Sequence, residues 1–412
     1  MITTDVLVIG AGPSGTVAAS LIKQAGLDVH IVEKLQFPRF VIGESLLPRC
    51  LDSLERAGFM PALETMGFQE KNGAKFVRRG EICDFSFEEQ FTKSGRKYAW
   101  QMPRADFDKC LADTCESMGI PVMYRQEVTN VVIAEDGSST TIVKDEISGE
   151  SYEIKARFIV DGSGYGRVIP KLFGLENPSS QATRKTIFAH MTDPIRMEQE
   201  EPNRIVVFVP EDDVWIWTIP FSNGNTSVGF VASPDFFDRF EEEDLYNKFK
   251  QMLAIEPVLA ERFANAEFIF EPKILQAWSA TTNTFYGNGF VLTGNVTEFL
   301  DPIFSSGVTL ATVSADSAAQ LVIKQLNGEH VDWEEAYMKP TMKGVNVFRT
   351  YVNAWYSGDL FKIFFSDKKT TEVKERICSV LAGYVWDDEN TFVEHHEKSV
   401  KAVVNYLETF SK

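Results

Sequence analysis

The sequence is poor in the residues that build metal centres and disulfide frameworks. It has five cysteines and five histidines among 412 residues. The cysteine count is odd and no CxxC pair occurs, so we expect the thiols to be small buried side chains in a reducing compartment. No cysteine lies at a zinc-ligand spacing from a histidine or an acid, and no metal site is therefore predicted.

Positive charge and long apolar runs are also scarce. The chain has 41 lysines and arginines against 59 aspartates and glutamates, which gives a net charge of −18. That balance disfavours nucleic acid and anionic membranes as partners, since both attract cationic side chains. No stretch approaches 18 apolar residues, and the first residues enter a strand pattern without a basic leader. We therefore expect a cytoplasmic protein with no integral membrane segment.

Glycine, by contrast, stands where a dinucleotide-binding turn needs it. The motif Gly10-x-Gly12-x-x-Gly15 is embedded in a strand–helix–strand pattern over residues 5–10, 16–25 and 28–33. Gly10 permits the sharp turn, Gly12 lets the backbone approach a diphosphate, and Gly15 lets the helix and strand pack closely. The helix N-terminus then offers free N–H groups and its positive dipole end to the phosphates.

An acidic residue, Glu33, ends the second strand of this unit. A carboxylate at this position can accept hydrogen bonds from both ribose hydroxyls, and it repels a 2′-phosphate. The pattern therefore predicts a site for FAD or NAD rather than NADP. The residues of this unit alone leave FAD and NAD open.

The nucleotide-type strands are separated by sheet-like insertions. Buried strand patterns occur at 5–10, 28–33, 157–161 and 290–294, and the last eighty residues are mostly helical. We predict a mixed α/β (α+β) fold with a discontinuous Rossmann-like nucleotide domain, an inserted antiparallel β-sheet substrate domain and a helical C-terminus. The predicted boundaries are 1–66, 101–184 and 286–329 for the nucleotide domain, 67–100 and 185–285 for the substrate domain, and 330–412 for the C-terminal region.

Four short segments resemble flavoprotein monooxygenases of the p-hydroxybenzoate hydroxylase fold. They are the glycine turn with Glu33, Pro103-Arg104-x-x-Phe107-Asp108, Asp161-Gly162 at a strand end, and Gly294-Asn295 before a proline loop. The resemblance covers most of residues 1–325. It implies that the cofactor is FAD, and that the nucleotide domain is a discontinuous Rossmann-like FAD-binding domain.

Further segments narrow the resemblance to flavin-dependent halogenases and their geranylgeranyl-reductase-like relatives. Trp215-Ile-Trp217-Thr-Ile-Pro220 matches the WxWxIP signature of the halogenases at each fixed position. The other similar segments lie at 37–46, 71–76, 299–307, 351–365 and 381–386. Their joint occurrence in the same order is what carries the resemblance.

The resemblance implies that Lys71 is the catalytic lysine. In this chemistry reduced FAD, oxygen and chloride or bromide give hypohalous acid, which a lysine captures and delivers to an electron-rich ring. Lysine suits the task because its amine donates hydrogen bonds, becomes nucleophilic when neutral and responds to burial in its pKa. A solvated surface lysine, or Lys75 in the catalytic position, remains the alternative.

The same resemblance assigns the tunnel, the halide site and the cofactor site. Trp215, Trp217 and Pro220 would wall a substrate tunnel that excludes water, and the N–H groups of Ser306 and Gly307 would hold halide. The tryptophans could instead be ordinary core, and the loop before Gly307 only a flavin-binding turn. The implied cofactor-binding residues are Gly10, Gly12, Gly15, Glu33, Lys34, Arg39, Ser45, Arg104, Asp161, Gly162, Asn295, Pro302 and Gly307.

The sequence departs from the family pattern at the second flavin motif. Asn295 stands where an aspartate is usual, and Glu298 adds bulk and charge where a small residue is common. These departures put flavin affinity or the halide site in doubt. No general base can be named, and His190, the one histidine of the predicted substrate domain, is expected to be structural.

The expected function is that of an FAD-dependent oxidoreductase, a halogenase-like monooxygenase acting on a phenol- or pyrrole-type aromatic. The substrate could be free or tethered to a carrier protein. No second nucleotide motif for NADPH is visible, so we expect reduced FAD to come from a separate flavin reductase. Two alternatives stay open: a flavin hydroxylase or geranylgeranyl-reductase-like FAD reductase, and a non-catalytic flavin-binding protein.

Overall fold

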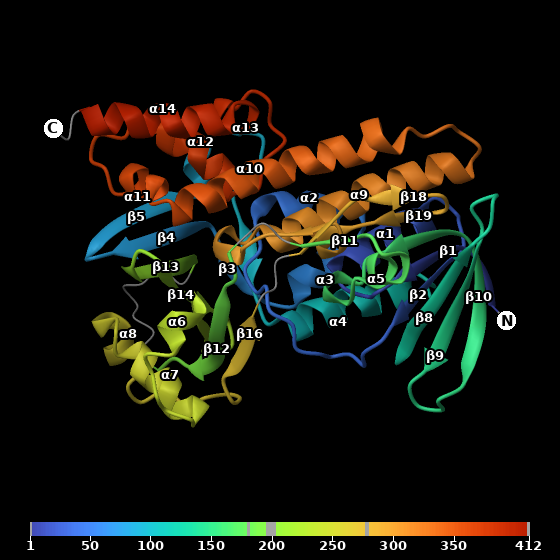
Figure 1. Cartoon of the computed structure of the whole chain (residues 1–412), viewed down its shortest axis with the longest axis horizontal. Coiled ribbons are helices and arrows are strands. Elements are labelled where there is room, and N and C mark those ends of the chain that lie inside the picture. Colours follow the sequence, from blue (N-terminus) through green and yellow to red (C-terminus); the bar gives the residue numbers. More distant parts are fainter. Residues whose placement is uncertain (1, 179–181, 195–202, 277–279, 410–412) are drawn as a thin grey trace.

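The computed structural model describes residues 2–178, 182–194, 203–276 and 280–409. It contains two large β-sheets of eight and seven strands, with helices packed around both (Figure 1). The arrangement is mixed α/β, as predicted. The helices are α1 (Pro13–Gln24), α2 (Pro48–Arg56), α3 (Met60–Thr65), α4 (Arg104–Ser117), α5 (Val168–Phe173), α6 (Pro234–Phe237), α7 (Leu245–Leu253), α8 (Pro257–Arg262), α9 (Ser306–Leu326), α10 (Lys339–Tyr356), α11 (Asp359–Phe364), α12 (Thr371–Leu381), α13 (Thr391–Glu394) and α14 (His396–Thr409).

The eight-stranded sheet joins segments that lie far apart in the sequence. Its strands are β18 (Tyr286–Gly287), β19 (Phe290–Leu292), β10 (Ser151–Asp161), β1 (Ile2–Ile9), β2 (Val29–Glu33) and β7 (Val122–Tyr124) in spatial order, with β9 (Ser139–Asp145) and β8 (Gln126–Ile133) extending from β10. From β19 to β7 the neighbours are parallel, so their carboxyl ends meet at one edge. The four buried strand patterns of the sequence all lie in this sheet.

Both faces of this sheet are covered, which explains the continuous apolar runs of its central strands. Alternate residues of β1 enter two different cores. Val6 and Val8 pack with residues of α1, α4 and α9, whereas Leu7 and Ile9 pack with residues of β9, β10 and α5. The glycine turn that follows β1 is therefore held from both sides.

The seven-stranded sheet is built from the two inserted segments. Its order is β16 (Lys273–Gln276), β12 (Lys185–Thr192), β15 (Asn225–Ala232), β14 (Val214–Pro220), β13 (Arg204–Glu211), β4 (Gly73–Arg78) and β5 (Glu81–Ser86). The neighbours are antiparallel as expected, except for β4 and β13, which are parallel. A parallel pair is possible there because a long part of the chain separates these two strands, whereas a short hairpin would force them to be antiparallel.

The two faces of β14 pack against different layers. Trp215 and Trp217 join a core shared with the C-terminal helices, including Trp355 of α10. Val214 and Ile216 face the other core, which is built with α6, α7 and α8. Figure 1 shows these layers: the red C-terminal helices lie above β4 and β5, and the yellow helices α6–α8 lie below.

Short pairs of strands complete the fold. β3 (Gln69–Lys71) pairs with β6 (Ala99–Gln101), and β17 (Ala280–Thr282) pairs with both β11 (Glu176–Asn177) and β20 (Glu298–Phe299). Among the described helices, none combines the length and the apolar character required to span a bilayer.

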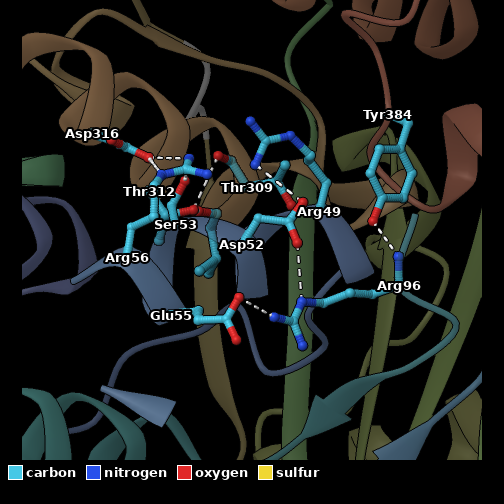
Figure 2. A network of polar contacts seen from close by, with 11 residues as sticks. Arg49, Asp52, Ser53, Glu55, Arg56, Arg96, Thr309, Thr312, Asp316 and Tyr384 are labelled. Carbon is cyan, nitrogen blue, oxygen red and sulfur yellow. Dashed lines mark hydrogen bonds and ion pairs between the residues drawn. The ribbon is translucent and has the colours of Figure 1, made fainter. Parts of the chain in front are cut away.

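A polar network ties α2 to α9 and to the C-terminal region (Figure 2). The Arg96 guanidinium donates to Asp52 Oδ1 at 3.0 Å and to Glu55 Oε2 at 2.6 Å, and its backbone N–H donates to the Tyr384 hydroxyl. Arg56 of α2 pairs with Asp316 of α9. The network therefore anchors the helix that begins three residues after Ser45.

Candidate functional site

A cavity of about 370 Å³ lies between the two sheets. It runs from the glycine turn after β1 to the tryptophans of β14. The predicted site residues that line it are Gly10, Gly12, Glu33, Lys34, Arg39, Ser45, Arg104, Gly162, Trp215, Trp217, Asn295, Pro302 and Gly307. The predicted residues that do not line it are Gly15, Lys71, Asp161, Pro220 and Ser306.

The glycine turn has the geometry that its sequence demands. Gly10 has a positive φ of 95°, a conformation that favours glycine. A Cβ on Gly15 would lie 1.9 Å from the Gly10 carbonyl oxygen, so a side chain there would separate α1 from β1. A Cβ on Gly12 would meet only Arg39 Nη2, at 3.6 Å, so the backbone at Gly12 is open toward the cavity.

The Glu33 carboxylate is held in place by backbone N–H groups. Its Oε2 accepts from Ala11 and its Oε1 from Leu35, both at 2.9 Å. Each carboxylate oxygen has a second lone pair, so the side chain can still accept hydrogen bonds from a ribose. Ribose binding by Glu33 stays a prediction.

Two arginines on the cavity wall are oriented by one buried carboxylate. Arg104 donates to both oxygens of Asp108, at 2.9 and 3.0 Å, and Arg39 Nη1 donates to Asp108 Oδ2 at 2.9 Å. Asp108 stood in the quoted Pro103–Asp108 motif but was not singled out as a site residue. Its role is to fix two positive charges where a diphosphate would benefit from them.

Asp161 supports the site without facing the cavity. Its Oδ1 accepts from the N–H of Ser163 at 3.0 Å, and its Oδ2 accepts from the N–H of Ile169 at 2.8 Å. Burial raises the pKa of this carboxyl. Asp161 therefore shapes the loop that brings Gly162 to the cavity wall.

The loop before α9 brings a second helix N-terminus to the cavity. Asp301 Oδ1 accepts from the N–H of Ile303 at 3.1 Å, and Ser305 adopts the left-handed conformation with φ of 56°. The helix then starts at the buried Ser306, and Gly307 and Val308 line the cavity. The first N–H groups of a 21-residue helix are a suitable place for an anion.

The tryptophans of β14 are at once part of the core and part of the cavity wall. Trp217 Nε1 donates to Ser227 Oγ at 3.0 Å, and its ring lies directly over Gly229. Trp215 Nε1 donates to the Tyr356 hydroxyl at 3.0 Å, which in turn donates to Asp301 Oδ2 at 2.9 Å. The core interpretation and the tunnel-wall interpretation are therefore compatible.

The same chain of hydrogen bonds links the tryptophan wall to the loop before α9. Burial raises the pKa of Asp301 to about 6, although the Tyr356 hydroxyl and the N–H of Ile303 partly oppose the effect. Pro220, at the end of β14, accepts through its carbonyl oxygen from Gln101 Nε2 at 2.9 Å. Pro220 thus braces the strand from behind the cavity.

Lys71 is buried, and the alternative of a solvated surface lysine is therefore wrong. Its side chain is 1% exposed, and Nζ donates to the Leu46 carbonyl oxygen at 2.8 Å. Burial lowers the pKa of Lys71 from 10.5 to about 7. Lys71 does not line the cavity, but its amine is bonded to Leu46, which directly follows the cavity-lining Ser45. An amine that is half neutral near pH 7 can act as a donor or as a nucleophile.

The departures in the second flavin motif are accommodated. Glu298 does not line the cavity, and its Oε1 accepts from Arg349 Nη2 of α10 at 2.7 Å. The added charge is therefore paired with a cation. Asn295 does line the cavity, where its amide can donate or accept.

The lining fits FAD. The glycine turn, the N-terminus of α1 and the two oriented arginines supply space and positive charge for a diphosphate. Ser45 Oγ faces the same site, is buried, and has no hydrogen-bond partner among the described residues. Such a hydroxyl points to a polar ligand atom. In the part of the chain that the structure describes, no cluster of three or more histidine, cysteine or acidic side chains could hold a metal ion.

Three polar side chains were not assigned to the site from the sequence: Glu44 lines the cavity, and His190 and Tyr356 each contact a residue that lines it. Glu44 lines it, although it stood unremarked in the quoted 37–46 segment. His190, which was expected to be structural, lies with Nε2 2.6 Å from Glu44 Oε1. Tyr356 is a third, bonded to Trp215. The sequence signal for Glu44 was its place next to Ser45.

Comparison with known proteins gives a consistent set of relatives. The family described as "FAD binding domain" matches residues 3–333. A 1H-pyrrole-2-carbonyl peptidyl-carrier-protein brominase from Pseudoalteromonas luteoviolacea is 26% identical over 392 residues, 93% of each chain. A 1H-pyrrole-2-carbonyl peptidyl-carrier-protein chlorinase from Pseudomonas fluorescens is 26% identical, with 97% of this chain and 93% of that one covered.

Solved structures include two informative neighbours. A flavoprotein/dehydrogenase from Cytophaga hutchinsonii is 49% identical with a TM-score of 0.97, and all of both chains is covered. The flavin-dependent halogenase CmlS is 27% identical with a TM-score of 0.77, covering 91% of this chain and 68% of that one.

Proposed function

This chain belongs to the FAD binding domain family, and from that premise we propose that it is a flavin-dependent halogenase of electron-rich aromatic compounds. Membership confirms the predicted FAD cofactor and the resemblance to the halogenase subgroup, whose curated members are among the relatives. The reaction and its substrate are the part that we propose.

One observation carries the proposal. One cavity connects the glycine turn to the tryptophan pair of β14, and a buried lysine of lowered pKa donates to Leu46, the residue after the cavity-lining Ser45. A hydroxylase needs its substrate against the flavin, whereas a halogenase needs a wall and a separate amine. Trp215, Trp217 and Lys71 supply that wall and that amine.

Each part of the chain has a distinct task in this proposal. When bound, reduced FAD supplies, with oxygen, the oxidising equivalent that turns halide into hypohalous acid. The N–H groups of Ser306 and Gly307 hold the halide, and the two tryptophans exclude water and keep the aromatic substrate apart from the cofactor. Lys71 hydrogen-bonds or captures the oxidant and presents it to the ring.

The names of the relatives suggest the substrate class and the partners. Two of them act on a pyrrole carried by a peptidyl carrier protein, so a pyrrole-type ring, free or tethered, is the first candidate here. A phenol is the second, because both rings are electron-rich. We further propose that a separate flavin reductase supplies reduced FAD, since no NADPH motif was found in the sequence.

A second candidate function is a flavin dehydrogenase or reductase. The description of the 49% identical structure as a flavoprotein/dehydrogenase favours it. Such an enzyme would reduce its own FAD directly with NADPH or with an organic substrate, without a partner reductase.

The deciding experiment supplies FAD, a flavin reductase with NADH, oxygen and either chloride or bromide to the purified protein. Phloroglucinol and pyrrole-2-carboxamide serve as probes, and mass spectrometry detects halogenated product. We expect halide-dependent product with the wild type and with Lys75→Met, and none with Lys71→Met, although all three bind FAD equally. Unchanged halogenation by Lys71→Met would refute the role of that lysine. Rapid anaerobic bleaching of the bound FAD by NADPH alone would support the dehydrogenase instead.

A further inference from the structure

Glu44 is a buried carboxylate with one unused oxygen. The residue is 1% exposed and lines the cavity, and its Oε1 lies 2.6 Å from His190 Nε2. No group within the described residues donates to Oε2, which is itself buried. Leaving such an acceptor unpaired costs free energy, so an unpaired one at a cavity points to a ligand donor.

The other buried carboxylates around the cavity do not share this feature. Glu33, Asp108, Asp161 and Asp301 each accept hydrogen bonds at both oxygens. In each of them the second oxygen is used to hold a loop, a helix or an arginine. Glu44 differs because only Oε1 is paired with His190, and Oε2 has no hydrogen-bond partner among the described residues.

The His190 ring of the pair is packed among aromatic side chains. The His190 ring lies 4.8 Å from the Phe270 ring, 5.0 Å from Phe221 and 5.8 Å from Phe40, measured between centroids. These rings hold the imidazole and do not line the cavity. The apolar wall of the cavity itself comes from Ile205, Trp215, Trp217, Ile219 and Val231, which suits a flat, apolar ring with one polar substituent. Thr186, which also lines the cavity, adds a second buried hydroxyl with no partner in the described part of the chain.

The segment that carries Glu44 also positions the candidate catalytic amine. Ser45 follows Glu44 on the cavity wall, and the carbonyl oxygen of the next residue, Leu46, accepts from Lys71 Nζ. Three consecutive residues therefore place an unused acceptor, an unused hydroxyl and the lysine around one short stretch of backbone. A substrate bound at Glu44 would be held near the place where Lys71 is anchored.

We propose that Glu44 Oε2 accepts a hydrogen bond from the ring-attached O–H or N–H group of the aromatic substrate, and that His190 is the positioning residue that orients this carboxylate. The substrate class is then a phenol or an N-unsubstituted pyrrole. Its O-methyl or N-methyl analogue leaves the acceptor unpaired and is rejected. The choice of an aromatic substrate rests on the proposed function, but the binding preference does not require turnover.

The test compares each donor with its methylated analogue by calorimetric titration of FAD-loaded protein. The pairs are phloroglucinol with 1,3,5-trimethoxybenzene, and pyrrole-2-carboxamide with its N-methyl derivative. The variants are Glu44→Met, which removes the acceptor at similar volume, and His190→Gln, which keeps a donor for Oε1. We expect Glu44→Met to reduce the preference for the donor over the methylated ligand by roughly 10- to 150-fold.

The preference ratio separates recognition from folding. A merely structural role would weaken both members of a pair alike and leave the ratio unchanged, which would overturn the proposal. We expect a smaller reduction for His190→Gln, because the carboxylate stays but loses its fixed orientation. FAD affinity, measured in parallel, should stay at the wild-type value in both variants. The thermal midpoint of Glu44→Met should fall because the buried His190 loses its partner, so the titrations are made well below that midpoint.

The remaining outcomes decide between this inference, a flavin-binding role of Glu44, and the proposed function. If Glu44→Met weakens FAD binding and leaves the ligand preference intact, Oε2 serves the flavin and the proposal is wrong. Failure of the wild type to bind any of the four ligands would overturn it as well. The protein could prefer the donor ligand over its methylated analogue through Glu44 and yet fail to halogenate. That result would refute only the proposed function. Halogenation with a preference independent of Glu44 would refute only this inference.

Discussion

Replacement of Lys71 by methionine is expected to stabilise the protein at neutral pH while abolishing the proposed activity. The two side chains have similar volume, but methionine carries no charge to desolvate. Burial lowers the pKa of Lys71 from 10.5 to about 7. Each pH unit of that difference corresponds to about 1.4 kcal/mol, so at pH 7 the buried amine costs about 4 kcal/mol of folding free energy.

The hydrogen bond of Lys71 reduces the expected gain. Nζ donates to the Leu46 carbonyl oxygen, and the variant leaves that acceptor without this donor. An unpaired buried acceptor costs about 1–3 kcal/mol. The net stabilisation by Lys71→Met at pH 7 is therefore expected to be about 1–3 kcal/mol.

The pH dependence is the sharper part of the prediction. The folded pKa of Lys71 lies below the unfolded one, so between pH 7 and 10.5 the unfolded chain holds a proton at this residue that the folded chain has released. Wild-type stability therefore increases as pH rises in this window. The free-energy cost of burying the charged Lys71 amine is fully present only below about pH 7. The advantage of Lys71→Met should shrink by about 2–3 kcal/mol from pH 7 to pH 9.

The assay is urea unfolding of FAD-saturated protein at pH 7, 8 and 9, followed by tryptophan fluorescence. It measures the difference in free energy of unfolding between variant and wild type. Other titrating groups cancel in that difference. Lys75→Met, on the neighbouring strand β4, is the matched control and should show no comparable trend. A difference for Lys71→Met that is independent of pH would refute the reasoning, because it would mean that the Lys71 amine stays protonated throughout.

Four further substitutions test the site. Gly15→Ala places a Cβ 1.9 Å from a carbonyl oxygen of the same turn, and urea unfolding should show a loss of about 3 kcal/mol or more in stability. Gly12→Ala makes only a 3.6 Å contact, so the variant should keep its thermal midpoint. Titration should show that Gly12→Ala binds FAD more weakly. The pKa of Asp301 is raised to about 6, so between pH 4 and 6 the folded chain holds a proton that the unfolded chain has released, and wild-type stability falls as pH rises. From pH 4 to pH 7, Asp301→Asn should therefore gain up to about 3 kcal/mol of stability relative to wild type. A stability difference between variant and wild type that stays constant with pH would contradict this. Gly229→Ala drives a Cβ to 2.2 Å from the Trp217 ring and should destabilise by about 1–3 kcal/mol, while an unchanged urea midpoint would show that the ring can move aside.

The local parts of the site could be predicted because they depend on residues close together in sequence. The glycine spacing predicted the turn after β1, and the structure gives Gly10 a positive φ and leaves no space for a side chain at Gly15. The alternation of Trp215 and Trp217 predicted that both side chains share one face of a strand, and both lie in one core. Periods of two and 3.6 residues determine such features before any tertiary contact forms.

Contacts between distant segments could not be predicted in this way. Glu44 and His190 are 146 residues apart, and Trp215 and Tyr356 are 141 apart. No periodicity or spacing rule connects them. Glu298 was read as a defect of the flavin motif for the same reason, because its partner Arg349 lies on a helix of the C-terminal region.

The sequence by itself determined which groups are available: a dinucleotide turn, a lysine singled out by the family resemblance, a tryptophan pair and the start of a helix where we propose that halide binds. Only the tertiary structure decided what those groups can do. Lys71 is an ordinary cation until packing removes its water, and Glu44 is an ordinary carboxylate until His190, from the distant strand β12, pairs with one of its oxygens. Burial and long-range pairing set pKa values and leave acceptors unused, and both arise only when distant segments meet.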